Sequence, residues 1–328
     1  MKEAADILRS IRQPVRDEMR RFNELLVECY KSENTFIAPM VDYVLEQRGK
    51  QMRPLLVLLS AALNGGVTDK SYTGAILVEM AHTASLVHDD VIDEAYMRRG
   101  QLSVNAVWRS HTAVLIGDYI LARALSHTAR QDAFELIGML VDSFEKLCEG
   151  ELIQMQYASH LNITEESYFD IIYRKTASLL GASAGIGAKS AGADEQAVAD
   201  MKRFGECIGM AFQIKDDLLD YEPSSETGKA GGNDLKERKI TLPLLYLLNH
   251  VTPGERKKLI DRISAVRDNE ENVAYIQKQV IGSGAVAYAE QVMRDYERQA
   301  LDILAGYPES PVRESLEQYC HFILQRKK

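Results

Sequence analysis

Hydrophobic residues recur every three or four positions along almost the whole chain, which is the pattern of helices that bury one face. Strand-like alternation of apolar and polar residues is scarce. The periodicity predicts helices over residues 3–31, 35–48, 53–64, 70–93, 103–128, 131–158, 164–191, 195–221, 240–249, 253–265, 269–281, 283–305 and 310–327. We therefore expect an all-α protein.

The length of 328 residues would by itself favour two domains. However, hydrophobic residues make up 46%, and only 8 prolines interrupt the helical pattern, so we expect one all-helical domain over residues 1–328. The one clear long loop is SSETGKAGGNDLKERK at 224–239, which is rich in glycine and charge. Loops of this length in compact domains are usually functional or disordered.

Charge and composition exclude several classes of protein. The net charge is −9 and no long basic stretch occurs, which argues against a nucleic-acid partner. The N-terminal stretch has no apolar signal core, and no apolar run approaches the ~20 residues of a membrane span. The four cysteines are far apart and form no CxxC pair, as expected of reduced thiols in a cytoplasmic protein.

A spacing of three aspartates occurs twice, about 130 residues apart, near the ends of two predicted helices. Its members are Asp89, Asp90, Asp93, Asp216, Asp217 and Asp220. On a helix, residues i and i+4 share a face, which places their carboxylates ~6 Å apart. These anions repel each other unless a cation lies between them, and oxygen ligands suit Mg²⁺, with Mn²⁺ as a substitute. A single copy is as readily a solvated acidic helix end, but two copies with apolar flanks favour metal sites that line a cavity.

Basic residues accompany the aspartates and are natural ligands of phosphate groups. They are Lys50 and Arg53 in GKQMRP, Arg98 and Arg99 in MRRG, Lys175 in YRKTA, and Lys229 and Lys239 in the long loop. Taken singly, each is most often a surface charge. Together with two metal sites they predict a pocket for two diphosphates, one bound through metal ions and one bound directly by side chains.

These segments resemble, in order and over nearly the whole chain, the trans-prenyltransferases of the polyprenyl diphosphate synthase family. The matching segments are GKQMRP, HTASLVHDDVIDEAYMRRG, AVLIGDYILARAL, YRKTASLL, GMAFQIKDDLLDY and GKAGGNDLKERKITLP. The resemblance implies an isoprenoid synthase-type bundle of about 10–13 helices around a central cavity. It also implies a homodimer that condenses isopentenyl diphosphate with an allylic diphosphate in the presence of Mg²⁺.

The resemblance assigns roles to individual residues. Asp89, Asp93 and Asp216 would hold the Mg²⁺ ions that pull on the allylic diphosphate. The expected ligands of that diphosphate are Arg98, Lys175, Lys229 and Lys239, and those of isopentenyl diphosphate are Lys50, Arg53, His82 and Arg99. Thr176 and Gln213 would stabilise the allylic cation with their dipoles. Gly228, Lys229 and Asp234 lie on a loop that would close over the site.

Product length is expected to depend on the helix that precedes Asp89. In this family, aromatic residues one turn before the first aspartate accompany short products. Here the corresponding positions are small or apolar and not aromatic, namely Leu77, Met80, Ala81, Ala84 and Ser85. Small side chains leave room for a deep tunnel and a product of about C40, within about C35–C50, although they also permit close helix packing. The chain resembles the octaprenyl-like, quinone side-chain branch, whose product would be delivered to a membrane.

Other functions remain open at this point. A shorter-chain farnesyl or geranylgeranyl diphosphate synthase would share every motif. A class I terpene cyclase would not need Lys50, Arg53 and Arg99 for a second diphosphate. A non-catalytic partner subunit predicts damaged aspartate motifs, and both are intact. A plain helical bundle leaves the cluster of basic residues unexplained.

Overall fold

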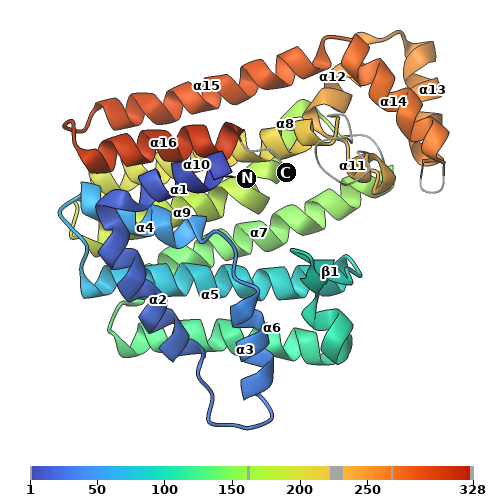
Figure 1. Ribbon diagram of the computed structural model, residues 1–328. Helices are drawn as coiled ribbons and strands as arrows, with labels where there is room; N and C mark the ends of the chain where they lie inside the picture. Colours follow the sequence, from blue (N-terminus) through green and yellow to red (C-terminus); the bar gives the residue numbers. More distant parts are fainter. Residues whose placement is uncertain (1, 161–162, 222–231, 267–268, 326–328) are drawn as a thin grey trace.

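The computed structural model describes residues 2–160, 163–221, 232–266 and 269–325, and these residues form a layered bundle of helices (Figure 1). The α-helices are α1 (Lys2–Arg12), α2 (Arg16–Tyr30), α3 (Ala38–Glu46), α4 (Met52–Leu63), α5 (Asp69–Ile92), α6 (Val104–Arg130), α7 (Phe134–His160), α8 (Glu165–Ile172), α9 (Ser178–Ser190), α10 (Glu195–Leu219), α11 (Asn233–Lys236), α12 (Leu242–His250), α13 (Pro253–Ser264), α14 (Glu270–Gly282), α15 (Ala285–Ala305) and α16 (Pro311–Gln325). The prediction of an all-α protein is confirmed.

Two of the predicted helices are each divided in the structure. The predicted helix 3–31 is interrupted by a 3₁₀ turn, Gln13–Val15, because Pro14 lacks an N–H and has a fixed φ. The predicted helix 164–191 contains a π-helical turn, Tyr173–Ala177, between α8 and α9. The short helix α11 lies inside the predicted loop 224–239. These three differences explain why the described residues form more helices than predicted.

The short hairpin after α5 was not predicted. Strand β1 (Met97–Arg98) pairs with β2 (Gln101–Leu102), and Arg98 lies opposite Gln101. The two turn residues Arg99 and Gly100 have φ values of 52° and 81°. Positive φ at both central positions is typical of the tight turns whose twist matches a hairpin. Strands of two residues are too short to show an alternating pattern, so no local signal predicts them.

Close helix packing places α9 and α10 at the centre of the bundle. A Cβ atom on Gly187 of α9 would lie 2.3 Å from the backbone oxygen of Val57 in α4. One on Gly205 of α10 would lie 2.3 Å from the backbone oxygen of Leu180 in α9. Only glycine permits such contacts between helix backbones. The small residues of SLLGASAGIGAKS therefore bring α4, α9 and α10 together.

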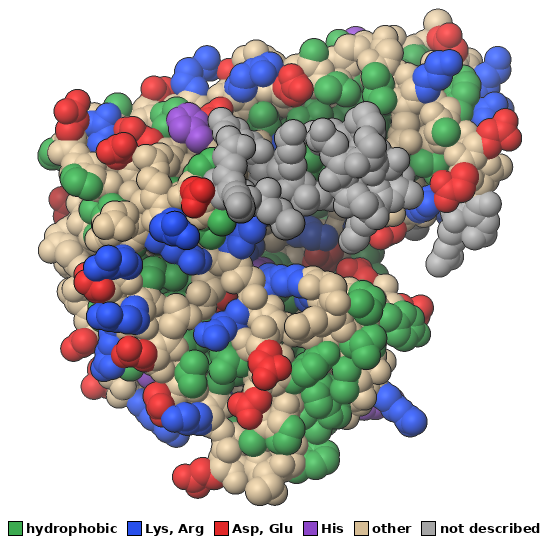
Figure 2. Space-filling view, in the orientation of Figure 1, with side chains coloured by type: hydrophobic (Ala, Val, Ile, Leu, Met, Phe, Trp, Pro, Cys, Tyr) green, Lys and Arg blue, Asp and Glu red, His purple; other side chains and the backbone are tan. Residues whose placement is uncertain are grey.

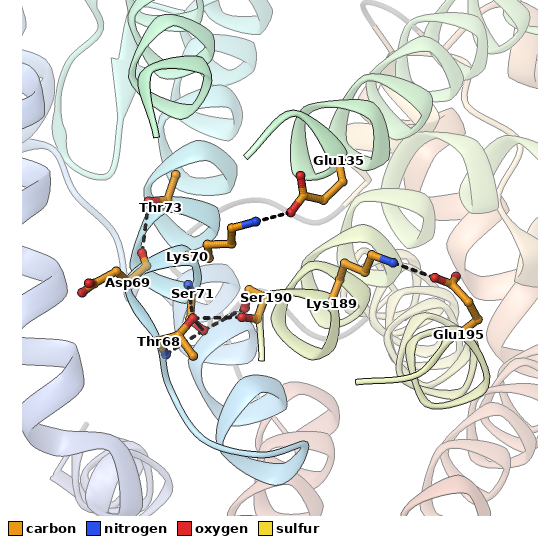
Figure 3. Close-up of polar contacts among 9 residues, drawn as sticks. All are labelled: Thr68, Asp69, Lys70, Ser71, Thr73, Glu135, Lys189, Ser190 and Glu195. Atoms are coloured by element: carbon orange, nitrogen blue, oxygen red, sulfur yellow. Dashed lines mark hydrogen bonds and ion pairs between the residues drawn. The ribbon is translucent and has the colours of Figure 1, made fainter. Parts of the chain in front are cut away.

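The N-terminal end of α5 is fixed by polar contacts to its neighbours (Figure 3). Thr68 and Ser71 form a reciprocal capping box, which satisfies two backbone N–H groups at the start of the helix. Thr68 also donates a hydrogen bond of 2.9 Å to the backbone oxygen of Ser190 in α9. The Lys70 ammonium lies 2.7 Å from a Glu135 carboxylate oxygen in α7. These contacts hold α5 against α7 and α9 at the end opposite Asp89 and Asp90.

Two further features bear on the expected environment of the chain. None of the helices in the described ranges is both long enough and apolar enough to cross a membrane. All four cysteines are free thiols. Cys207 and Cys320 are buried, Cys29 is half-buried and Cys148 is exposed.

Candidate active site

Both aspartate motifs lie at the C-terminal ends of long helices, as predicted. Asp89 lies in the last turn of α5, which ends at Ile92, and Asp93 caps that helix. Asp216 lies in the last turn of α10, which ends at Leu219. The face in Figure 2 is hollowed between its upper and lower parts, and acidic and basic side chains line this hollow.

Two lysines that act on the first motif line a cavity with Asp217 of the second motif. The charge of Lys175 acts on the carboxylates of both Asp89 and Asp93. The charge of Lys239 acts on Asp93, and Lys239 in turn feels the carboxylate of Asp234. Lys239 and Asp234 line one cavity together with Lys175 and residues of α10. The lysines near the first motif therefore lie in the same cavity as Asp217, a residue of the second motif that is far away in sequence.

Negative charge at the first motif is poorly compensated. Burial and the neighbouring Glu151 carboxylate raise the pKa of Asp89 from 3.8 to about 6. Burial also raises the pKa of Asp93. The Lys175 ammonium lies between Glu151 and Gln154 of α7, at 2.6 Å and 2.9 Å from their side-chain oxygens. A bound cation would stabilise the ionised form of these carboxylates.

The middle aspartate of the first motif is bound inside the protein. Asp90 is only 2% exposed, and both of its carboxylate oxygens accept hydrogen bonds of 2.8 Å from Arg98 Nε. Arg98 Nη2 lies 2.7 Å from one of the same oxygens. Charge-assisted contacts of this kind restrict a guanidinium group strongly. Asp90 therefore orients Arg98.

A second cavity is lined by two of the four residues expected to bind isopentenyl diphosphate, and also by Arg98, which was expected to bind the allylic diphosphate. His82 and Arg99 line it, and Arg53 Nη1 lies 2.9 Å from His82 Nε2. Burial, together with the charges of Arg53 and Arg99, lowers the pKa of His82 well below its ordinary value. The imidazole is therefore neutral and accepts the hydrogen bond from Arg53. Lys50 does not line this cavity; its ammonium lies 5.4 Å from the ring centroid of Phe322 in α16.

The position of Arg99 depends on two backbone features. Its φ of 52° turns the side chain back towards the segment before α4, where Nη1 donates a hydrogen bond of 2.8 Å to the Gln47 oxygen. A Cβ atom on Gly49 would lie 2.5 Å from the Arg99 guanidinium. Only glycine leaves room for this approach. The buried Glu79 carboxylate, whose pKa is raised by burial, provides negative charge near Arg53 and Arg99.

In the second motif, Asp217 and Asp220 are also bound by protein groups. Asp217 accepts hydrogen bonds from the Tyr168 hydroxyl at 2.6 Å and from Gln213 Nε2 at 3.1 Å. Burial and the nearby Asp234 carboxylate raise the pKa of Asp217 to about 8, and these two hydrogen bonds act in the opposite direction. Asp220 accepts from the backbone N–H groups of Gly232, Asn233 and Asp234 at 2.9, 3.0 and 3.2 Å. Asp220 therefore holds the start of α11 in place.

The π-helical turn Tyr173–Ala177 carries Lys175 and Thr176. Such turns occur often at functional sites because they redirect side chains within a helix. Two glycines on neighbouring helices make space for it. A Cβ atom on Gly150 would lie 3.0 Å from the Lys175 backbone nitrogen, and one on Gly209 would lie 2.4 Å from Ala177 Cα. Thr176 Oγ1 donates a hydrogen bond of 2.8 Å to Gln213 Oε1, so the two predicted dipolar residues are in contact.

The predicted lid is described only in part. Gly228 and Lys229 lie outside the described residues. Asp234 lies on α11, and Lys239 follows it with its ammonium 2.5 Å from a Glu237 carboxylate oxygen.

The residues expected to set product length are all buried along α5. Leu77, Met80, Ala81, Ala84 and Ser85 are each at most 8% exposed. Leu77, Ala81, Ser85 and Asp89 follow one another at intervals of four, so they form a ridge that leads away from the first motif. The five residues belong to the core, and neither of the two cavities above is lined by them.

Sequence reasoning missed several residues that hold the predicted ones. Glu151 and Gln154 hold Lys175, and Tyr168 holds Asp217. Glu151 and Gln154 are three positions apart on a predicted helix, so both lie on one face. This spacing could have indicated that they act together. Tyr168 precedes Thr176 by about two helical turns, but its partner Asp217 is distant in sequence. No local pattern connects them.

Comparisons with known proteins identify the family of this chain. A family model described as polyprenyl synthetase matches residues 34–280. The short chain isoprenyl diphosphate synthase of Methanothermobacter thermautotrophicus is 34% identical over 95% of this chain and 99% of that protein. The octaprenyl diphosphate synthase of Escherichia coli is 32% identical over 97% and 99%. A crystal structure of polyprenyl synthase from Caulobacter crescentus, complexed with calcium and isoprenyl diphosphate, has a TM-score of 0.89 at 31% identity, with 98% of each chain covered.

The matched segment contains both aspartate motifs, the hairpin and the π-helical turn. The family resemblance read from the motifs is thereby confirmed. The chain belongs to the polyprenyl synthetase family of prenyltransferases.

Proposed function

We propose that this prenyltransferase adds isopentenyl units repeatedly to an allylic diphosphate and releases an all-trans product of about C40. The observation that carries the two-substrate reaction is the pair of separate basic sites. Lys175 and Lys239 line one cavity, whereas His82 and Arg99 line another, where Arg53 Nη1 lies 2.9 Å from His82 Nε2. Relatives of similar identity are named for short and for long products, so sequence identity does not decide the product length. Our proposal of a long product rests on the small buried residues Ala84 and Ser85.

The family depends on divalent metal ions, and we propose Mg²⁺ for this chain. Among the described residues, no three carboxylate, imidazole or thiolate groups come together closely enough to form a complete metal site. Oxygen donors from Asp89, Asp93 and Asp216 fit Mg²⁺, which takes few protein ligands and binds substrate phosphates as well. Their raised pKa values at the first motif fit a site that is completed by a cation. When bound, Mg²⁺ would supply Lewis-acid assistance to departure of the diphosphate.

The remaining groups have roles that follow from their charge and position. The allylic diphosphate is bound by Lys175, Lys239 and Arg98, which neutralise its charge as it departs. The sequence also predicts Lys229 as a ligand of this diphosphate. Thr176 and Gln213 direct oxygen dipoles towards the resulting cation, which stabilises it without forming a bond. Arg53, Arg99 and neutral His82 bind isopentenyl diphosphate, with Lys50 at the exposed edge. The released diphosphate is the base that removes the last proton.

The direct test is incubation of the protein with farnesyl diphosphate, isopentenyl diphosphate and Mg²⁺, followed by chromatography of the dephosphorylated products. We expect a main product of about C40. A main product of C20 or shorter would support the farnesyl or geranylgeranyl alternative. Consumption of the allylic diphosphate alone, with formation of a cyclic hydrocarbon, would support a terpene cyclase. No consumption of either substrate would contradict the proposed function.

Arg53→Ala is expected to raise the KM for isopentenyl diphosphate about 10- to 100-fold, because a charged hydrogen-bond donor is lost. The KM for the allylic substrate should change little. Lys239→Ala is the reciprocal variant and should affect the allylic substrate more. Steady-state titration of each substrate against both variants checks the assignment. Equal effects on the two substrates in Arg53→Ala would contradict it.

Mg²⁺ is expected to raise the melting temperature more at about pH 7.5 than at about pH 5, because metal binding requires ionised carboxylates. The pKa of Asp89 is raised to about 6. The ionisation of Asp89 therefore destabilises the metal-free protein as the pH rises from 3.8, the ordinary pKa of this group, to about 6. Bound Mg²⁺ removes this penalty above that range. Thermal unfolding with and without Mg²⁺ at several pH values measures the difference. In Asp89→Asn the dependence on pH should be weaker.

We further propose a homodimer in the cytoplasm. Helices α6 and α7 carry large apolar side chains that are exposed in the single chain, among them Leu115 at 67%, Phe134 at 62% and Leu152 at 67%. Apolar side chains also gather at the lower right of the face in Figure 2. Exposed apolar residues at this density favour burial against a second copy. The four free thiols fit a reducing compartment.

A further inference from the structure

A chain of buried hydrogen bonds links α8 to the π-helical turn through α10. The Tyr168 hydroxyl donates to Asp217 Oδ2 at 2.6 Å, and Gln213 Nε2 donates to Asp217 Oδ1 at 3.1 Å. Thr176 Oγ1 then donates to Gln213 Oε1 at 2.8 Å. Tyr168, Asp217 and Thr176 are 3%, 5% and 7% exposed. The four side chains form a continuous path from a buried tyrosine to the two dipolar residues of the site.

The direction of every hydrogen bond in this path follows from the Asp217 carboxylate. Its two oxygens accept hydrogen bonds from the Tyr168 hydroxyl and from Gln213 Nε2, so the amide NH₂ of Gln213 faces Asp217. The carbonyl end of Gln213 then faces Thr176, and the Thr176 proton must point to that carbonyl. The lone pairs of Thr176 are consequently directed away from Gln213. If the carboxylate were displaced, the Gln213 amide could turn over and the Thr176 proton could point towards the substrate instead.

We propose that Tyr168 and Asp217 are positioning residues that fix the orientation of the Gln213 and Thr176 dipoles towards the allylic cation. This inference rests on the proposed function. A dipole stabilises a developing charge only when it is already oriented, because reorientation during the reaction costs free energy. Tyr168 holds one carboxylate oxygen while Gln213 takes the other. In this proposal, Asp217 orients the Gln213 carbonyl and the Thr176 hydroxyl, and it is not a ligand of the metal ion.

The first test is Tyr168→Phe, which removes one hydroxyl and keeps the ring. We expect kcat for the first condensation to fall about 10- to 100-fold, since small misplacements at a reaction centre have effects of this size. The KM of both substrates should change less than about threefold, because the interaction acts in the transition state. The matched control is Tyr221→Phe. Tyr221 is also buried, and its hydroxyl bonds Thr241 at 3.0 Å, outside this path. Its kcat should stay within about threefold of wild type.

The second test is a double-mutant cycle with Thr176→Val. If Tyr168 acts through Thr176, the Tyr168→Phe change should lower kcat less than about twofold in the Thr176→Val background. Losses that multiply would overturn the proposal, because a merely structural role is independent of Thr176. Asp217→Asn gives a second route if Tyr168→Phe does not fold, since an amide can donate to Gln213 and release its orientation. The same kcat loss and the same non-additivity are expected.

The Mg²⁺ dependence distinguishes positioning from metal binding. Tyr168→Phe and Asp217→Asn should need the same Mg²⁺ concentration for half-maximal rate as the wild type. A requirement raised about tenfold or more in Asp217→Asn would assign Asp217 to the metal and overturn the inference. Failure of the proposed function has a different signature, because the wild-type protein itself would then form no elongated product.

Discussion

Asp89→Ala and Asp216→Ala are each expected to lower kcat by about 10³-fold or more, because loss of a metal-held contact in the transition state removes several kcal/mol. The fold should survive both changes. Asp89 carries a pKa raised by burial, so its charge is already unfavourable in the metal-free protein. Removing that charge should leave the melting temperature without Mg²⁺ unchanged or higher. Turnover and thermal unfolding, measured on the same preparations, check both statements.

The control for these variants is Asp220→Ala. Asp220 belongs to the same motif but accepts three backbone N–H groups at the start of α11. Leaving buried donors unpaired destabilises a protein by about 1–3 kcal/mol each. Asp220→Ala should therefore lower the melting temperature, unlike Asp89→Ala. Near-normal turnover in Asp89→Ala or Asp216→Ala would exclude that aspartate from the metal site.

The contrast among these aspartates illustrates what the sequence could predict. Periodicity identified the long helices and placed both motifs at helix ends, because burial of one face is encoded locally. Spacing placed Asp89 and Asp93 on one face of the helix, but it did not separate the structural role of Asp90 from theirs. They differ because Arg98, on a hairpin with no strand signal, turns back and binds Asp90.

Long-range contacts account for most of what the sequence could not predict. The pairing of Tyr168 with Asp217 joins α8 to α10, and the approach of Arg99 to Gly49 joins the hairpin to the segment before α4. Neither contact follows from a local pattern, since each depends on how the helices pack. The family resemblance supplied roles for the aspartates and basic residues, but the second layer of residues that orients them was found only in the structure.

The second large effect is expected in product length. If Ala84 lines the path of the growing tail, Ala84→Phe should shift the product from about C40 to about C15–C20, because one helical turn of ~5.4 Å is close to the length of one isoprene unit. The first condensation should continue, since the aspartates are unchanged. Leu77→Phe, about two turns further from Asp89, should give a product of intermediate length. Chromatography of the dephosphorylated products measures both.

Close packing offers the competing explanation of the small residues, and it predicts a different result. Ala84 is 1% exposed. If it packs against a neighbouring helix with no tail beside it, the added ring overpacks the core and costs about 1–3 kcal/mol of stability. Ala75 is the matched control, because it is equally buried and lies nine residues away, on the opposite face of α5. Ala75→Phe should lower the melting temperature without shortening the product. An Ala84→Phe enzyme that behaves in the same way, destabilised but with a product of full length, would exclude Ala84 from the tunnel.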